Sequence, residues 1–196
     1  MAPTLHLTGD ADADALLSLD PLALLIGMLL DQQIRMETAF AGPAKLKSRL
    51  GGEFSARAIA DTDPAALEAL FRQTPSVHRF PGSMAQRTQT LARALLADWD
   101  GDAAALWTRG EPDGPEVLRR LTSLPGFGAQ KAKIFLALLG KRYEVEPPGW
   151  REACAPYGEE GSHRSVADIV DGESLGKVRE FKRAAKASAQ AGSAAG

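Results

Sequence analysis

Helix-start signals recur along this chain, whereas the alternating pattern of β-strands is nearly absent. Asp20-Pro21 and Asp63-Pro64 each place a capping carboxylate before a proline that suits the first helical position. Ser83 and Gln86 fit a capping box at another start. Apolar residues then recur at helical spacing, and the sequence therefore predicts an all-α fold with helices over residues 21–30, 36–50, 64–71, 83–99, 115–121, 127–139 and 175–187.

The longest apolar run, residues 22–30, is about half as long as the roughly 20 residues that a membrane span requires. Asp31-Gln32-Gln33 closes it, so we expect a buried helix. The first residues show no basic region followed by an apolar segment and a cleavage site. We therefore expect no membrane partner and a cytoplasmic location, at the nucleoid if the protein is bacterial.

The composition fits one globular unit, because 44% of the 196 residues are hydrophobic and 24% are charged. We expect a single helical domain over residues 1–187 and a disordered tail over residues 188–196, which are small, polar and rich in glycine and alanine. The single cysteine, Cys154, excludes an internal disulfide, a cysteine-rich zinc site and a four-cysteine iron-sulfur cluster.

Residues 124–132 read Leu-Pro-Gly-Phe-Gly-Ala-Gln-Lys-Ala and lie between two helical patterns. Gly126 and Gly128 around one apolar residue are typical of a turn whose backbone comes close to a partner. Amides at the start of the following helix suit a phosphate. Because the net charge is only -2, any nucleic-acid contact must be local. We expect a basic cluster beside the turn, formed by Lys131, Lys133, Lys141 and Arg142, although such a turn can also be a plain connector.

The turn and two further segments resemble a known family of proteins. Residues 21–34, Pro-Leu-Ala-Leu-Leu-Ile-Gly-Met-Leu-Leu-Asp-Gln-Gln-Ile, look like the early helix and glutamine-bearing end of the helix-hairpin-helix superfamily of base-excision DNA glycosylases. Residues 79–96 are similar to the helix that follows the central loop of that family. The family includes the endonuclease III, MutY and AlkA classes, and the likeness covers most of residues 20–150.

The resemblance implies a two-lobed helical fold that clamps damaged double-stranded DNA and turns one base into a cleft between the lobes. In that scheme the amides of Gly126, Gly128 and Ala129 hold a phosphate, and a monovalent cation can sit on hairpin carbonyls. Gln33 or its neighbour Gln32 fills the gap left by the flipped nucleotide. The implied DNA-binding set is Gln32, Gln33, Gly126, Phe127, Gly128, Ala129, Lys131 and Lys133.

The catalytic positions depart from the family. Bifunctional members carry a lysine two residues after the second hairpin glycine, which attacks the sugar to form a Schiff base, and this chain has Gln130 there. Lys131 is rotated by about 100 degrees from that direction, so we interpret it as a phosphate contact or a solvated lysine. The family aspartate after the second helix is also missing. Glu146 follows a valine and can replace it, and Asp31 is a second candidate carboxylate.

Two hypotheses follow from these residues. The first is a monomeric glycosylase without lyase activity that hydrolyses the N-glycosidic bond of a damaged or mismatched base. The second is a non-catalytic helix-hairpin-helix DNA-binding protein that has lost the catalytic aspartate. A helical interaction module without a nucleic-acid partner leaves the hairpin unexplained. We favour the glycosylase because the glutamine-bearing element is retained.

Overall fold

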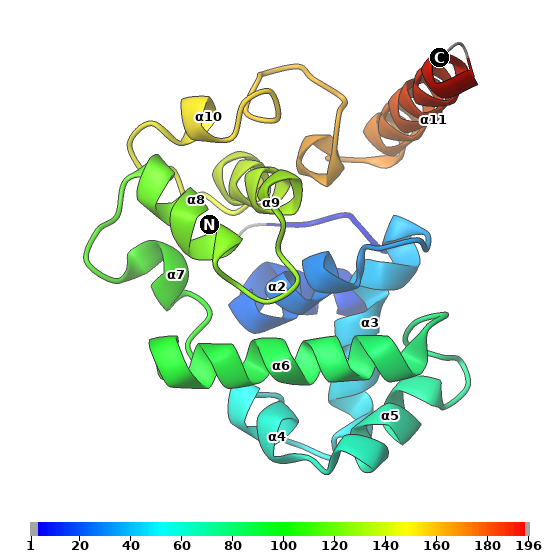
Figure 1. Cartoon of the computed structure of the whole chain (residues 1–196), viewed down its shortest axis with the longest axis vertical. Helices are drawn as coiled ribbons and strands as arrows, with labels where there is room; N and C mark the ends of the chain where they lie inside the picture. Colours follow the sequence, from blue (N-terminus) through cyan, green and yellow to red (C-terminus); the bar gives the residue numbers. More distant parts are fainter. Residues whose placement is uncertain (1–3, 195–196) are drawn as a thin grey trace.

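The computed structural model describes residues 4–194, which contain helices and no strand (Figure 1). The predicted all-α class is therefore confirmed. The elements are α1 (Ala11–Leu19), α2 (Pro21–Leu30), α3 (Met36–Arg49), α4 (Ala56–Asp61), α5 (Pro64–Arg72), α6 (Pro81–Trp99), α7 (Ala105–Thr108), α8 (Gly114–Thr122), α9 (Ala129–Arg142), α10 (Trp150–Ala153), the 3-10 helix η1 (Val166–Asp168) and α11 (Gly172–Ala194).

Two groups of helices share one core. In the first group α2 packs on α3, and α4 and α5 pack on the long helix α6. In the second group α8, α10 and η1 pack on α9 (Figure 1). Buried side chains from both groups, such as Leu25, Leu95 and Phe135, belong to the same hydrophobic cluster. Burying these apolar side chains is the main force that holds the two groups together.

The two Asp-Pro signals start helices as predicted. The Asp20 carboxylate accepts hydrogen bonds from the amides of Leu22 and Ala23, at 2.9 and 3.2 Å, and Asp63 caps α5 in the same manner. The capping box at Ser83 is wrong, because α6 already begins at Pro81, whose fixed φ suits the first helical turn.

The apolar run of α2 is buried from Leu22 to Leu30, as predicted for a core helix. No single helix among residues 4–194 is long and apolar enough to cross a bilayer, although α1 and α2 together, bent by 114°, have the required length and composition.

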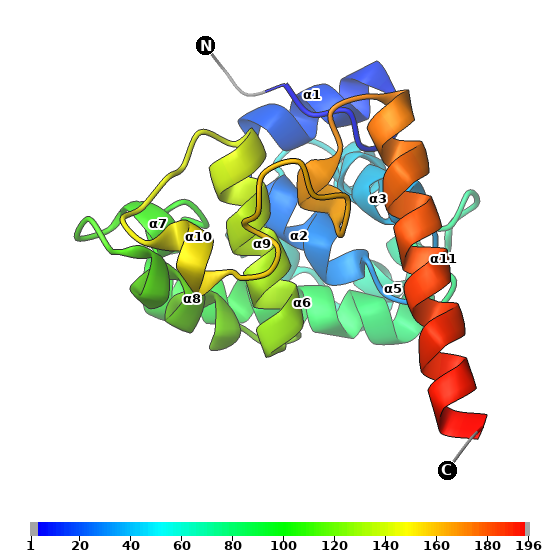
Figure 2. The ribbon, with the colours of Figure 1, turned by 90° about the horizontal axis from the view of Figure 1, so that it is seen from above.

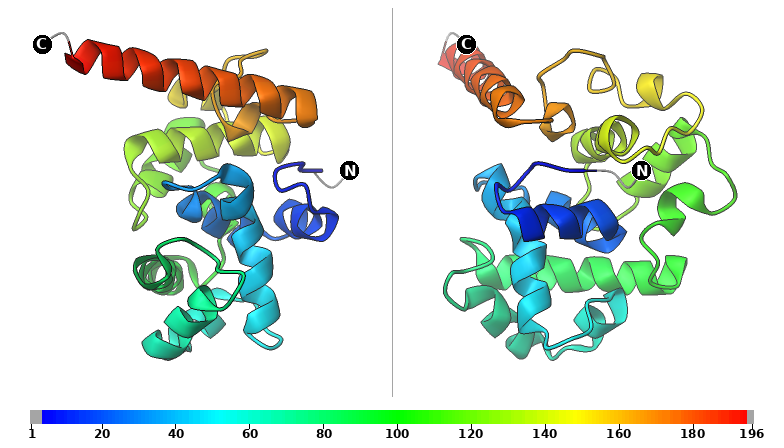
Figure 3. Two further views of the ribbon diagram at one scale, coloured as in Figure 1. Left: turned by 90° about the vertical axis from the view of Figure 1, so that its right-hand side faces the viewer. Right: turned by 180° about the vertical axis from the view of Figure 1, so that it is seen from behind.

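The C-terminal helix differs from the prediction. The expected disordered tail over residues 188–196 is wrong over most of its length, because α11 continues to Ala194; residues 195–196 lie outside the described part of the chain. Alanine has the highest helix propensity, and the alanine-rich composition that favours a flexible tail favours helix equally. Figure 2 and Figure 3 show α11 running beyond the rest of the molecule.

Candidate nucleic-acid interface

The predicted hairpin joins α8 to α9 and lies against the end of α2. Gly126 has a φ of 83°, and a Cβ atom at this position would lie 2.5 Å from Leu29 Cδ1. The turn is closed by a 3.1 Å hydrogen bond from the amide of Phe127 to the carbonyl of Leu124. Only glycine combines this backbone conformation with this close approach. Gly126 therefore docks the hairpin on α2.

Gly128 differs from Gly126 in both respects. It is the N-cap of α9 with a φ of −73°, and no heavy atom lies within 4 Å of a Cβ built there. No side chain caps this helix end, and the first amide that bonds back along α9 belongs to Ala132, whose acceptor is the Gly128 carbonyl at 3.0 Å. The preceding amides have no partner one turn earlier in the helix, as a phosphate site requires.

Phe127, between the glycines, has a buried side chain. It is 3% exposed and packs edge-to-face on Phe135, with ring centroids 6.0 Å apart. The ring therefore anchors the hairpin in the core, and any contact of Phe127 with DNA, which stays a prediction, is left to its main chain.

Lys131 is directed toward α2 rather than toward solvent. Its Nζ donates to the carbonyls of Met28, Leu29 and Asp31 at 2.7, 3.1 and 3.4 Å. These carbonyls lie at the end of α2, where main-chain acceptors lack helical partners. Burial lowers the pKa of Lys131 to about 8, and the charge of Asp31 opposes this shift. Lys131 is therefore not a solvated lysine, and its contact with a phosphate stays a prediction.

The predicted basic cluster is also wrong, because its members lie at different ends of a 14-residue helix that is about 20 Å long. Lys133 donates to the Ala155 carbonyl at 3.2 Å, one turn into the helix. At the opposite end, Lys141 forms a 2.6 Å ion pair with Asp168, with side chains only 7% and 3% exposed. Arg142 donates to the carbonyl of Ala167.

The turn after α2 separates the two glutamines. The side chain of Gln32 donates to the Leu29 carbonyl at 3.2 Å and accepts from Arg87 at 2.8 Å, so it is held against the protein. Gln33 is exposed and has a φ of 55°, which non-glycine residues adopt rarely and mostly where surrounding structure enforces it. Gln33 is therefore the better placed of the two to enter a DNA duplex.

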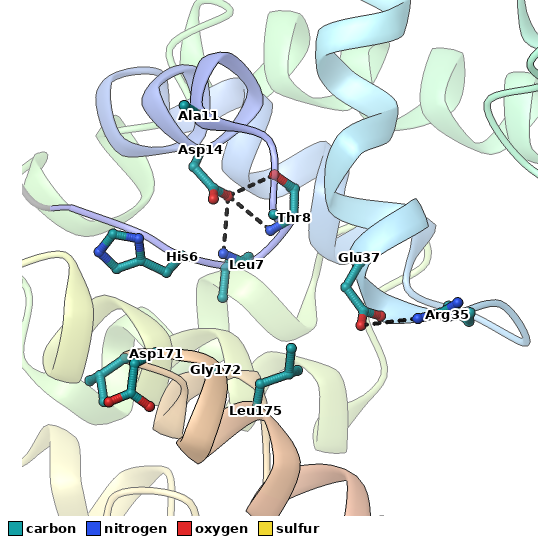
Figure 4. Close-up of a pocket in the computed structure, with 12 residues that line it drawn as sticks. His6, Leu7, Thr8, Ala11, Asp14, Arg35, Glu37, Asp171, Gly172 and Leu175 are labelled. Carbon is teal, nitrogen blue, oxygen red and sulfur yellow. Dashed lines mark hydrogen bonds and ion pairs between the residues drawn. The ribbon is translucent and has the colours of Figure 1, made fainter.

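Three adjoining cavities form a groove between this turn and α11, and we call it the α11 groove. The central cavity, of about 560 Å³, is lined by Asp31, the apolar Ile34 and Val178, and basic side chains of α11. A second cavity, of about 770 Å³, continues past Gln33 to Arg79. A third, of about 680 Å³, continues toward the N-terminal segment, where Asp14 holds the amides of residues 7 and 8 (Figure 4). Arg35 lines all three cavities.

The two candidate catalytic carboxylates have different surroundings. Asp31 is partly buried in the wall of the α11 groove. Burial raises the pKa of its carboxyl above the ordinary value, and the nearby ammonium groups of Lys182 and Lys131 oppose this rise. Glu146 is exposed and follows the opposite end of α9, in a cavity shared with Lys141 and Arg151. The groove beside Gln33 therefore contains Asp31 and not Glu146.

Gln130, at the position of the family lysine, donates from Nε2 to the hydroxyl of Tyr157 at 2.9 Å. Tyr157 reaches this place because the chain after α10 runs back along α9, as the bond from Lys133 to Ala155 also shows. The sequence contains no periodic pattern that predicts this return, and the contact between Gln130 and Tyr157 could therefore not be predicted from it.

A family model described as HhH-GPD superfamily base excision DNA repair protein matches residues 26–189. The chain belongs to this superfamily. The match runs from α2 through the hairpin and into α11, and thus covers every element that lines the candidate interface apart from the N-terminal segment. No curated protein and no solved structure matches the chain.

Membership of the HhH-GPD superfamily assigns the chain to base excision DNA repair and to DNA binding. The two elements predicted to contact DNA, the hairpin and the turn after α2, lie on one side of this HhH-GPD protein. In the left view of Figure 3 and in Figure 2, the hairpin before α9, the turn after α2 and the C-terminal half of α11 face the same way. Figure 2 shows the turn between the other two. Sequence reasoning missed the α11 side of this face, because it interpreted that helix only as charged.

Proposed function

We propose that this HhH-GPD protein is a monofunctional DNA glycosylase, which hydrolyses the N-glycosidic bond of a damaged or mismatched base in double-stranded DNA. The observation that carries the proposal is the partly buried Asp31 carboxylate in a groove directly beside the exposed Gln33. A glycosylase must take the base out of the stack and stabilise the positive charge that develops on the sugar. Gln33 and Asp31 are placed for these two tasks.

Each step has a candidate group. The open amides at Gly128 and Ala129 hold a phosphate near the lesion. Gln33 enters the stack and replaces the flipped nucleotide, with an amide that can donate to and accept from the orphan base. The extruded base enters the α11 groove, whose central cavity is within the range of roughly 300–1,000 Å³ typical of small-ligand sites.

The carboxylate of Asp31 acts in its ionised form. As the bond between sugar and base lengthens, positive charge develops on the sugar, and a fixed negative charge in a partly desolvated wall stabilises it more strongly than water does. The neighbouring Lys182 and Lys131 favour the ionised carboxylate. The bond from C1′ to the base nitrogen breaks with its electron pair on the base, water forms a bond to C1′, and the proton that the water loses ends on the released base, which leaves an abasic site.

The same residues argue against a lyase step. Gln130 has no amine that can form a Schiff base, and its amide is bonded to Tyr157. The amine of Lys131 donates to three carbonyls at the end of α2. The product is therefore an abasic site in an intact strand.

A monovalent cation on the hairpin is part of this proposal. The ligands that the turn offers are main-chain carbonyls, of which those of Leu121, Leu124 and Gly128 each also accept a main-chain hydrogen bond. No group of three His, Cys, Asp or Glu side chains gathers among the described residues. Carbonyl oxygens suit a hard monovalent ion better than a transition metal. Held there, the ion would add positive charge beside the phosphate. The proposal includes no iron-sulfur cluster.

The test is base release from duplexes that each carry one uracil, alkylated, deaminated or oxidised base. We expect release from at least one duplex, with strand cleavage only after alkali. Asp31→Asn should slow release by about 100-fold or more, the scale seen when one electrostatic contact to a transition state is removed. Glu146→Gln is the matched carboxylate control and should release the base at the rate of the unaltered protein. Base release by Asp31→Asn at the rate of the unaltered protein would remove Asp31 from the mechanism, and slower release by Glu146→Gln alone would assign the catalytic carboxylate to Glu146.

A non-catalytic DNA-binding protein is the second candidate function. It is favoured by one observation, the Val-Glu-Pro-Pro sequence at residues 145–148 in place of the family's aspartate-bearing segment. Binding to damaged duplexes without release of any base from the whole series would establish this function instead.

A further inference from the structure

Four cations form a stripe along α11. Arg179, Lys182, Arg183 and Lys186 follow the spacing i, i+3, i+4, i+7, which places them on one side of a helix. All four are exposed, and all four line the central cavity of the α11 groove. From the first to the last, the stripe extends over about 10 Å.

The groove beneath the stripe has a local excess of positive charge. Its central cavity and the one past Gln33 are lined by six Lys or Arg side chains and by two acids, whereas the whole chain carries a net charge of -2. The acids, Asp31 and Glu37, lie toward the body: Glu37 forms ion pairs with Arg35 and Arg179, and Asp31 lies near Lys182. Arg183 and Lys186 lie further along the helix, toward its C-terminal end.

The stripe-bearing helix α11 and the hairpin lie on opposite sides of the turn after α2, which carries Gln33. Figure 2 shows the hairpin before α9, the turn after α2 and α11 in this order across one face. A side chain that enters the stack from this turn would have a backbone strand on either side of it. The hairpin supplies amides to one side, and the stripe supplies side-chain cations to the other.

We propose that the stripe of α11 binds the phosphate backbone of duplex DNA on the side of Gln33 opposite the hairpin. The partner is a row of phosphates rather than bases, because four flexible cations in line carry no pattern that distinguishes one base edge from another. Over the roughly 10 Å of the stripe, one DNA strand presents about three phosphates. The inference rests on the DNA binding that the proposed function requires, but not on catalysis.

The experiment measures binding of the full chain to a fluorescent duplex that carries an abasic site, at a series of salt concentrations. Each cation that contacts a phosphate contributes about 0.9 to the slope of log K against log salt. Arg183→Gln with Lys186→Gln should therefore lower the slope by nearly 2 and weaken binding by at least about tenfold near 0.1 M salt. Arg183→Lys with Lys186→Arg keeps both charges and should keep the slope.

The matched control is Lys47→Gln with Arg57→Gln, which removes two exposed cations on α3 and α4, outside the groove. It should leave the slope unchanged. If Arg183→Gln with Lys186→Gln has the same slope as this control, while Gly128→Leu still weakens binding, the stripe does not contact DNA. This result would overturn the inference and leave the proposed function intact. No binding by the unaltered protein would overturn both, whereas normal binding without base release would overturn only the glycosylase. A lower slope of log K against log salt in Arg183→Lys with Lys186→Arg would show that these side chains affect DNA binding through packing rather than charge. This result would also overturn the inference.

Discussion

The two ends of α9 differ in how their main-chain groups and neighbouring side chains are satisfied. At the first end, Gly128 has open space around it and its helix has no side-chain cap. At the last end, a Cβ atom on Gly140 would lie 2.5 Å from the ring of Trp150, and Lys141 is paired with Asp168 out of solvent. The open end leaves main-chain donors for a ligand, whereas the closed end satisfies its polar groups internally.

The closed end also positions part of the interface. The Asp168 carboxylate accepts hydrogen bonds from the amides of Arg164 and Ser165 and from the Ser162 hydroxyl, in addition to Lys141. Asp168 ends η1, and η1 contacts α11. The buried pair at the end of α9 thus fixes the start of the helix that carries the basic stripe.

The largest effect should come from breaking the closed end. Lys141→Met leaves the Asp168 carboxylate buried without its cation, and removal of one partner from a buried ion pair costs about 3 kcal/mol or more of unfolding free energy. Urea denaturation measures this loss. Lys133→Met, on the same helix but with an exposed hydrogen bond, should change stability by less than about 0.5 kcal/mol. Similar losses in the two variants would contradict the distinction between the ends.

A smaller loss of unfolding free energy is expected at Gly126, where the hairpin before α9 packs on α2. Gly126→Ala places a Cβ against Leu29 in a left-handed conformation, which costs about 1–2 kcal/mol for an L-residue before any movement of Leu29. The midpoint of urea unfolding should fall while the slope of the transition stays the same. An unchanged midpoint would show that Gly126 is replaceable and that the hairpin docks by other contacts.

The fold could be predicted where short-range chemistry decides it. Asp20 and Asp63 with their following prolines specify helix starts within a few residues, and the apolar run of α2 indicates burial. The start of α6 was misplaced because Ser83 satisfies a local motif that the earlier Pro81 overrides. The length of α11 was misjudged because small residues are compatible with both helix and disorder.

The site could be predicted less completely, because it depends on contacts between distant segments. The hairpin glycines and Gln33 are visible as local patterns. The direction of Lys131 is not, since its acceptors lie about one hundred residues earlier in the chain. The same holds for the α11 groove, in which α11 faces the turn after α2. Side chains that stand close in sequence, such as Lys131 and Lys141, were wrongly grouped because the length of α9 separates them.

A pH-dependent effect should distinguish Lys131 from a surface lysine. Because its folded-state pKa of about 8 lies below the ordinary value of 10.5, the unfolded chain binds more protons between these values, and stability gains from this group as pH rises. Between about pH 7 and about pH 9 the gain is about 1 kcal/mol, relative to Lys131→Met. Urea denaturation of both proteins at several pH values tests this. Parallel pH curves would contradict the burial of the amine at the end of α2.

The smallest stability effect, and the most direct test of the open end, is at Gly128. Its φ of −73° and the space around it accept any L-residue, so Gly128→Ala should change the unfolding free energy by less than about 0.5 kcal/mol. Gly128→Leu should fold equally well but keep a phosphate away from the amides. Loss of one hydrogen bond to a charged group weakens binding by about tenfold, and should do so alike for duplexes of different sequence, because the amides contact only the backbone. Fluorescence anisotropy with two unrelated duplexes measures this. A variant that binds both duplexes normally would show that DNA is not held at this end of α9.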